Sequence, residues 1–299
     1  MKTYFHHIAC PECGKGNDSK RTSCVHCKAD LNNRDAKKFE QQLIVPFWKE
    51  IVFFLLALFG LSAIATVVQS IQLSMVMGQN PELSLQEAAK VVSSGGYILF
   101  LEFFAYGMVF LGAGTLLWSS WKDIGKSLAN WKPYLMGIAG LAVIMAFEMS
   151  YNMVTSMILK AAGIEPASNN NQSAIVTIVS MAPFLSVIVF GFIGPFVEEL
   201  AYRVGLFGFL SRINKVFAYV GVPLVFGLIH FDFGAGFDFA NVSSCVNEWV
   251  NLPIYMFSGL VFSFLYDKFG FGASLVAHTA NNVFSISMII IQNAVGGNA

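Results

Sequence analysis

Charged residues are scarce in this sequence, and their scarcity excludes an ordinary soluble fold. Of the 299 residues, 56% are hydrophobic and only 12% are charged, whereas a soluble domain carries about a quarter charged residues. The mean hydropathy is +0.62, so the chain has too few polar side chains to cover a surface in water. Its apolar residues gather into runs of the roughly 20 residues that cross a bilayer. The sequence therefore predicts a membrane protein whose main surroundings are lipid, and we expect no nucleic-acid partner.

Two further features are missing. The N-terminus lacks the short apolar core and small-residue cleavage site of a removable signal peptide, so we expect the first spanning helix to be an uncleaved anchor. No internal repeat is visible, which disfavours a transporter built from paired halves.

The long apolar runs predict an all-α polytopic membrane protein of about seven spanning helices, preceded by a small N-terminal zinc ribbon. The expected helices are 47–77, 96–118, 133–159, 174–194 continuing into 195–210, 216–232, 249–267 and 272–293. We divide the chain into residues 1–45 (ribbon and linker), 46–129 (N-terminal helices) and 130–295 (a helical core).

Basic residues predict the orientation, because Lys and Arg in short connections stay on the cytoplasmic side. Nine of the 18 basic residues precede the first long apolar run. If the N-terminus is cytoplasmic, the connections on that side hold Lys122, Lys126, Lys132, Arg212, Lys215 and Lys268. An odd number of helices then places the C-terminus outside a multi-pass protein of the cell membrane.

Two Cys-x-x-Cys pairs, Cys10 with Cys13 and Cys24 with Cys27, lie in the polar N-terminal segment. Two tight turns of this kind supply the four sulfurs that zinc accepts in a tetrahedral site. A disulfide pair is the alternative, and the reducing cytoplasm disfavours it. Since four thiolates leave no position for water, this zinc is expected to be structural. The segment resembles the zinc ribbons at the ends of many bacterial membrane proteins.

Ionisable side chains within spanning helices are costly and indicate function. Glu198 and Glu199 are adjacent, and Glu199 lies four residues before Arg203, so these two can pair on one helix face. Glu198 points about 100° away and has no such partner on its own helix. This asymmetry predicts Glu198 as the catalytic base, with Glu199 and Arg203 in supporting positions.

Three polar side chains on later helices complete the candidate site. His230 follows Phe226 by four residues, and Asn282 follows His278 by four. His278 and Asn282 share a helix face and can present two donors to one developing oxyanion. Any one of these residues has a structural explanation, such as an interhelical hydrogen bond. Together they form a set that can activate water and stabilise a tetrahedral intermediate.

Other polar residues are weaker candidates. Asn281 is turned away from the face shared by His278 and Asn282. Glu102 and Glu148 lie outside the motifs in the second and third helices, where they either line a polar route to the site or pair with a basic group.

The order Glu-Glu-x-x-x-Arg, Phe-x-x-x-His and His-x-x-x-Asn on successive apolar helices resembles the CAAX-processing and bacteriocin-processing (CPBP, or Abi) intramembrane proteases. The likeness covers roughly residues 130–293 and includes Pro195 and Gly205 near the first motif. It implies a peptide or membrane-protein substrate, a water held by Glu198 and His230, and an oxyanion hole made by His278 and Asn282.

The same residues also suit a second chemistry. Two His and one Glu are also a ligand set for a zinc hydrolase, although Asn282 is a poor zinc ligand and favours a metal-free glutamate mechanism. The settings that the resemblance implies are peptide maturation, bacteriocin self-immunity and regulatory proteolysis. The competing hypothesis is a non-proteolytic membrane scaffold or immunity protein that recruits a cytoplasmic partner through the ribbon.

Overall fold

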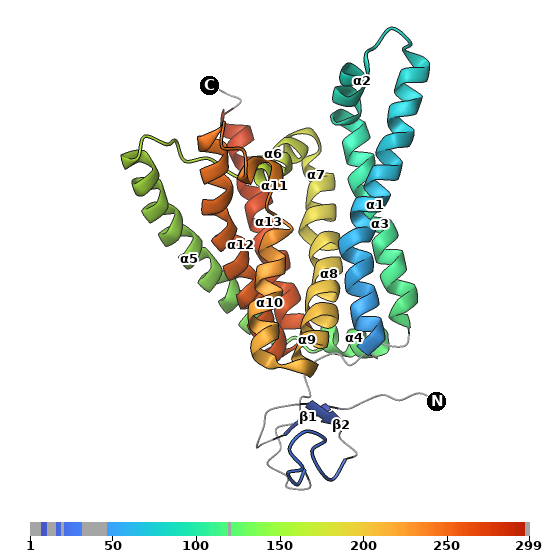
Figure 1. The fold of residues 1–299 in the computed structure, drawn as a ribbon, viewed down its shortest axis with the longest axis vertical. Coiled ribbons are helices and arrows are strands. Elements are labelled where there is room, and N and C mark those ends of the chain that lie inside the picture. The colour runs from blue at the N-terminus through green and yellow to red at the C-terminus, as the bar shows by residue number, and fades with distance from the viewer. Residues whose placement is uncertain (1–6, 11–15, 19–20, 32–46, 119–120, 297–299) are drawn as a thin grey trace.

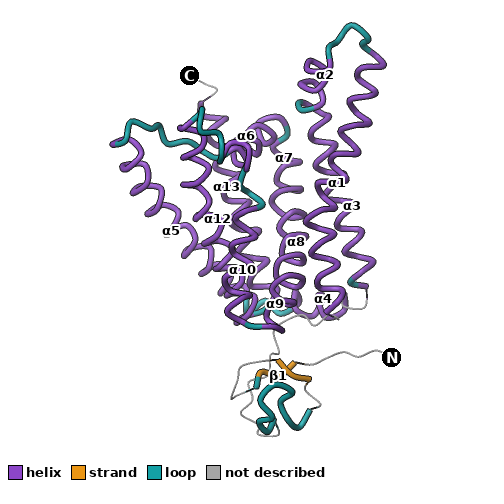
Figure 2. The backbone as a smooth tube through the Cα atoms, in the orientation of Figure 1, coloured by secondary structure: helices purple, strands orange, loops and turns teal. Residues whose placement is uncertain are grey.

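The computed structural model describes residues 7–10, 16–18, 21–31, 47–118 and 121–296. Strands β1 (His7–Ala9) and β2 (Gly16–Asp18) pair antiparallel, with His7 opposite Asp18. Nearly all of the remaining described chain is helical (Figure 2). The protein is thus an all-α polytopic membrane fold that begins with a small cysteine-containing module.

The helical part begins with α1 and ends with α13 (Figure 1). Its elements are α1 (Phe47–Gln79), α2 (Leu85–Val92), α3 (Gly95–Leu116), α4 (Trp121–Ala129), α5 (Tyr134–Ala161), α6 (Asn170–Met181), α7 (Pro183–Ser186), α8 (Gly194–Glu199), α9 (Gly208–Ile213), α10 (Lys215–Leu228), α11 (Phe233–Gly236), α12 (Val242–Phe269) and α13 (Phe271–Gly296). Two π-helical stretches, η2 (Val187–Ile193) and η3 (Leu200–Phe207), flank α8.

Six helical segments of the described chain are long and apolar enough to cross a membrane. The fifth predicted helix, 216–232, corresponds to α10, which has only 14 residues. At 1.5 Å per residue it spans about 21 Å, less than the ~30 Å of a hydrocarbon core. Large apolar side chains remain exposed on the outer helices, including Phe59 at 63% and Met149 at 71%, as expected for surfaces that contact lipid.

The predicted fourth helix is wrong at its start. Residues 174–181 belong to the separate helix α6, and the spanning segment begins at Pro183. Proline disfavours helical backbone in the residue before it, and Ala182 accordingly has φ −146° and ψ 72°. Helix α12 also begins earlier than predicted, at Val242 instead of residue 249.

Close helix contacts position the elements that carry polar residues. Helix α10 packs against α12, where a Cβ on Gly227 would lie 2.6 Å from Met256. Helix α1 packs against η3, where a Cβ on Gly205 would lie 3.0 Å from the Glu50 carbonyl. Small residues permit this close approach in membrane helix packing.

The two ends of the helical bundle carry different elements (Figure 1). The lower end holds the start of α1 together with α4 and α9, and the upper end holds α2, α6 and α11. The turn between α12 and α13 uses Gly270 with φ +91°, a conformation that glycine adopts without steric cost. In Figure 1, α8 runs toward the lower end of the bundle and α13 runs toward the upper end, so the two helices are antiparallel.

Candidate active site

The acidic pair sits on α8, between two π-helical stretches. Such stretches are rare and occur often at functional sites. In η2 the N–H of Gly194 donates to the carbonyl of Val189, five residues earlier. Continuing that register would require an N–H at position 195 to pair with the Phe190 carbonyl, but Pro195 has none. The sequence therefore leaves the Phe190 carbonyl without its helical donor.

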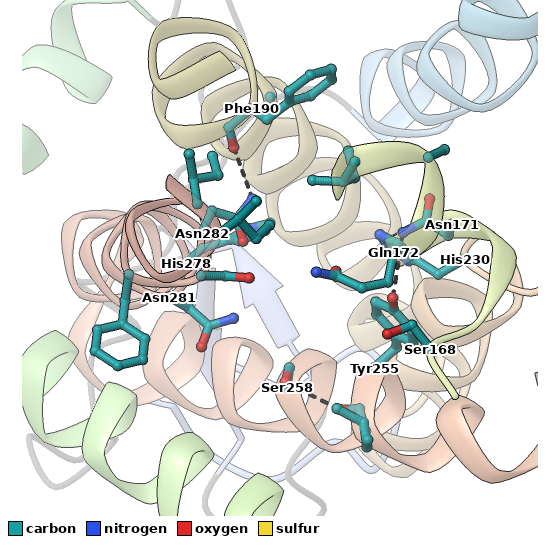
Figure 3. A pocket seen from close by; sticks show the side chains of 18 of the residues that line it. Ser168, Asn171, Gln172, Phe190, His230, Tyr255, Ser258, His278, Asn281 and Asn282 are labelled. Carbon is teal, nitrogen blue, oxygen red and sulfur yellow. Dashed lines mark hydrogen bonds between the residues drawn. The ribbon is translucent and has the colours of Figure 1, made fainter. Parts of the chain in front are cut away.

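Asn282 satisfies this open carbonyl. Its Nδ2 atom donates to the carbonyl oxygen of Phe190 at 2.9 Å, which links α13 to η2 (Figure 3). A side-chain amide has two N–H donors, so this bond fixes the orientation of the amide and leaves a second donor. Asn282 is half-buried at the pocket described below.

Glu199 is fully buried and makes three side-chain contacts. Its Oε1 lies 3.2 Å from Nη2 of Arg203 and 2.9 Å from Nδ1 of His278, and the Ser274 hydroxyl donates to its Oε2. Arg203 is itself buried, with its guanidinium 5.1 Å from the ring centre of Phe226. The expected Glu199–Arg203 pair is thus present, and Glu199 also binds His278 and Ser274.

Glu198 occupies a different environment on the same turn. Its side chain is 14% exposed, whereas that of Glu199 is 0% exposed. The Tyr106 hydroxyl of α3 donates to its Oε1 at 3.3 Å, and Nε2 of His278 lies 3.7 Å from its Oε2. Glu198 is therefore partly exposed and lines the pocket, while Glu199 is held within the core.

His230 lies just after α10, and its ring is held from two sides. Its Nδ1 lies 2.7 Å from the Phe226 carbonyl, and its ring stacks on Tyr255 of α12 with centroids 4.5 Å apart and planes 10° apart. A carbonyl only accepts, so Nδ1 carries the proton in the neutral ring and Nε2 is left as an acceptor. The Tyr255 hydroxyl donates to Asn169 Oδ1 at 3.2 Å, and Asn169 Nδ2 donates to the His230 carbonyl at 2.9 Å.

These residues share one pocket of about 570 Å³. Its lining includes Glu198, His230, His278 and Asn282, the four residues predicted as catalytic. Figure 3 labels His230, His278 and Asn282 around it. Buried polar groups that converge in a cavity are the usual form of an active site. Residues as far apart in sequence as Glu198 and Asn282 thus meet around a volume large enough for several residues of a peptide.

The pocket also contains polar residues that the sequence ranked low or missed. Glu102 and Glu148 both line it, as the polar-route interpretation expects. Asn281 lines it too, so the expectation that Asn281 faces away is wrong. The α13 surface at the pocket is wide enough to include adjacent positions, 100° apart.

Tyr106, Tyr255 and Ser274 are the contacts that sequence reasoning missed. Ser274 lies four residues before His278 on the same helix face, a spacing that was available as a signal. Tyr106 and Tyr255 lie in ordinary apolar helices with no motif, so only the tertiary structure reveals their contacts with Glu198 and His230.

The N-terminal module brings three cysteines together. The sulfur atoms of Cys10, Cys24 and Cys27 all lie within 4.8 Å of one another. Four sulfurs around a zinc ion at about 2.3 Å lie roughly 3.8 Å apart, so the spacing fits a metal. Cys13, the fourth predicted ligand, lies outside the described residues.

The environment of Cys24 also suits metal binding. Burial raises the pKa of its thiol, but hydrogen bonds from the backbone of Cys27 and His26 and from Asn17 together lower that pKa to about 5. The thiolate, which is the metal-binding form, is therefore favoured at neutral pH.

Residues 180–284 match the family of the type II CAAX prenyl endopeptidase Rce1-like proteins. The matched region is narrower than the likeness over residues 130–293 seen in the sequence, and it contains all three motifs. No curated protein and no solved structure matches the chain. Over this region the chain is similar to a family of CAAX prenyl endopeptidases.

Proposed function

We propose that this chain is an intramembrane endopeptidase in which Glu198, His230, His278 and Asn282 hydrolyse a peptide bond. The observation that carries the proposal is their convergence on one pocket from α8, the end of α10 and α13. Residues that activate water and residues that donate to an oxyanion must lie around the same carbonyl group.

Glu198 and His230 are placed to activate water. Glu198 offers a carboxylate oxygen at the pocket, and His230 offers Nε2 as a second acceptor. The water oxygen attacks the scissile carbonyl carbon while its proton moves to Glu198. Glu198 then returns that proton to the departing amine nitrogen as the C–N bond breaks, which balances the hydrolysis.

His278 and Asn282 are assigned to the oxyanion. The second amide N–H of Asn282 is available, since only one donor is bound to Phe190. Because Nδ1 of His278 faces the Glu199 carboxylate, that nitrogen carries a proton, and donation by Nε2 requires the doubly protonated ring.

The geometry favours a glutamate mechanism over a catalytic metal. Among described residues, the group of three His, Cys, Asp or Glu donors that converges within 4.8 Å is that of Cys10, Cys24 and Cys27. Coordination by Glu198, His230 and His278 would require their donor atoms to move closer. Asn282 also suits amide donation better than zinc binding.

The proposal also covers the orientation of the chain, its metal and its partner. We place the N-terminal module in the cytoplasm and the C-terminus outside, assign a structural zinc to Cys10, Cys13, Cys24 and Cys27, and assign the module a cytoplasmic partner. Peptide maturation and bacteriocin self-immunity are the settings we consider for the reaction.

The test compares membrane and secreted peptides from cells that carry the intact protein or its Glu198→Gln variant, measured by mass spectrometry. General-base catalysis contributes at least about 100-fold, so we expect substrate to accumulate and product to disappear in the variant. Glu82→Gln is the matched control, because Glu82 is exposed in the α1–α2 connection. Identical peptide profiles for the intact and Glu198→Gln proteins would leave the scaffold hypothesis in place.

A further inference from the structure

The pocket reaches only one end of the bundle. From Glu198 it extends along Ser168 before α6, Asn171 and Gln172 on α6, and Gln292 near the end of α13. These elements lie at the upper end in Figure 1. None of the residues that line it comes from α4, α9 or the Gly270 turn at the lower end.

Toward the lower end of the bundle, packed side chains close the pocket below Glu198. Glu199, Arg203, Phe207 and Tyr266 are all fully buried. Phe207 packs edge-to-face on Tyr266 with ring centroids 5.9 Å apart. A peptide therefore has a polar route to Glu198 from the upper end and a packed core at the lower end.

The same two ends differ in charge. Basic residues at the lower end, among the described side chains, are Lys49, Lys122, Lys132, Arg212, Lys215 and Lys268. The upper end has Lys90 and Lys160 together with Glu82, Glu87, Glu165, Asp232 and Asp238. The orientation rule counts Lys and Arg in short connections even when they are paired, and it places the lower end in the cytoplasm.

We propose that the pocket opens to the extracytoplasmic face and that the substrate is a peptide segment presented from that side. The substrate part of this inference rests on the proposed function, because that function makes the pocket a peptide-binding site. The direction in which the pocket opens does not depend on catalysis. The substrate class is then a translocated peptide, or the external juxtamembrane segment of a membrane protein. A lipid-anchored cytoplasmic tail would face the closed end of the bundle.

Cysteine accessibility in intact bacterial cells tests the direction. Three single substitutions are compared, all in a Cys245→Ser background that removes a buried native thiol. Ser168→Cys is at the pocket mouth, Ser243→Cys is at the same end outside the pocket, and Asn130→Cys is at the opposite end; all three positions are exposed. A membrane-impermeant maleimide is added before or after permeabilisation, and modified sites are identified by mass spectrometry.

We expect Ser168→Cys and Ser243→Cys to be modified in intact cells and Asn130→Cys only after permeabilisation, with at least a tenfold difference. Modification of Asn130→Cys in intact cells overturns the orientation. Modification of Ser243→Cys without Ser168→Cys overturns the open mouth. Absence of modification at both upper sites in intact cells also overturns the proposal.

Cleavage positions provide the second readout. Peptides that differ between the intact and Glu198→Gln proteins should map to extracytoplasmic segments of their parent proteins. Mapping to cytoplasmic tails contradicts the inference while leaving the protease intact. If no peptide differs, the proposed function fails, and the labelling result still decides where the pocket opens.

Discussion

His278 is hydrogen-bonded to Glu199, the buried member of the acidic pair: its Nδ1 lies 2.9 Å from the Glu199 carboxylate. Its other nitrogen, Nε2, lies 3.7 Å from the Glu198 carboxylate. One imidazole therefore connects two adjacent carboxylates with different surroundings. A histidine whose second nitrogen is bound by a carboxylate has a fixed orientation, so Glu199 sets the direction in which His278 acts.

Glu199→Gln should lower substrate processing by about 10–100-fold, the usual effect of removing a residue that orients a functional histidine. The charge that holds the Nδ1 proton of His278 is lost, while Glu198 is unchanged. Processing is measured on the peptides that accumulate with Glu198→Gln. Unchanged processing would contradict the orienting role.

The buried Glu199–Arg203 pair should couple strongly in stability. Breaking a buried pair by removing one partner costs about 3–5 kcal/mol, because the other charge stays buried. We therefore expect Arg203→Met and Glu199→Gln each to lower the thermal midpoint in detergent. The double variant should lower that midpoint by less than the sum of the two single changes. Additive losses would show that the pair is not coupled.

Tyr255 should act on the reaction through His230. Tyr255→Phe keeps the aromatic ring that stacks on the imidazole but removes the hydroxyl that donates to Asn169. Tyr255→Ala removes both. We expect a small loss of processing for Tyr255→Phe and at least a tenfold loss for Tyr255→Ala, with a changed pH profile for the latter. Equal losses in the two variants would contradict ring stacking as the cause.

The cysteine module should bind one zinc ion per chain. The pKa of the Cys24 thiol is about 5, so the thiolate dominates above that pH and is lost as the pH falls through it. Because zinc competes with protons for the thiolates, metal measured in the purified protein should be retained at neutral pH and released as the pH falls into the acid range. Cys24→Ser should remove the metal without changing the pocket, with Cys245→Ser as the matched control.

Zinc-free intact protein would overturn this assignment. A Cys24→Ser protein that keeps one equivalent of zinc to pH 4 would contradict the role of Cys24 as a ligand.

The Glu50–Arg212 pair should hold α1 against the segment that carries the acidic pair. Two nitrogens of Arg212, Nε and Nη2, each donate to a Glu50 oxygen at 2.7 Å, and the Glu50 side chain is only 2% exposed. Arg212→Ala leaves that carboxylate unpaired and should cost about 3–5 kcal/mol. Lysine cannot make the bidentate contact, so Arg212→Lys should retain only part of this stabilisation. Thermal unfolding in detergent with both variants tests this order.

Much of the fold was predictable because hydrophobic run length is a local property. The bounds predicted for the first, second, third and last spanning helices differ from the structure by no more than a few residues. The fourth differs because the backbone bends at Ala182, before Pro183. A break of this kind leaves the apolar composition unchanged, so hydropathy cannot reveal it.

The residue types of the candidate site were also present in local spacing. Glu199 and Arg203 are four apart, and so are His278 and Asn282, which placed each pair on one helix face. The prediction for Asn281 was wrong, because the surface that faces the pocket depends on how α13 is packed against its neighbours. Helical periodicity gives the angle between two side chains but not the direction of the cavity.

The sequence by itself determined that the chain lies in a membrane, which ionisable groups it carries there, and which end bears the positive charge. These follow from composition and short-range spacing. Only the tertiary structure decided that Glu199 holds His278, that Tyr255 supports His230, that Asn282 binds the Phe190 carbonyl, and that the pocket opens at one end. Such contacts join residues 25 to 92 positions apart, and their geometry is set by helix packing, which no local pattern specifies.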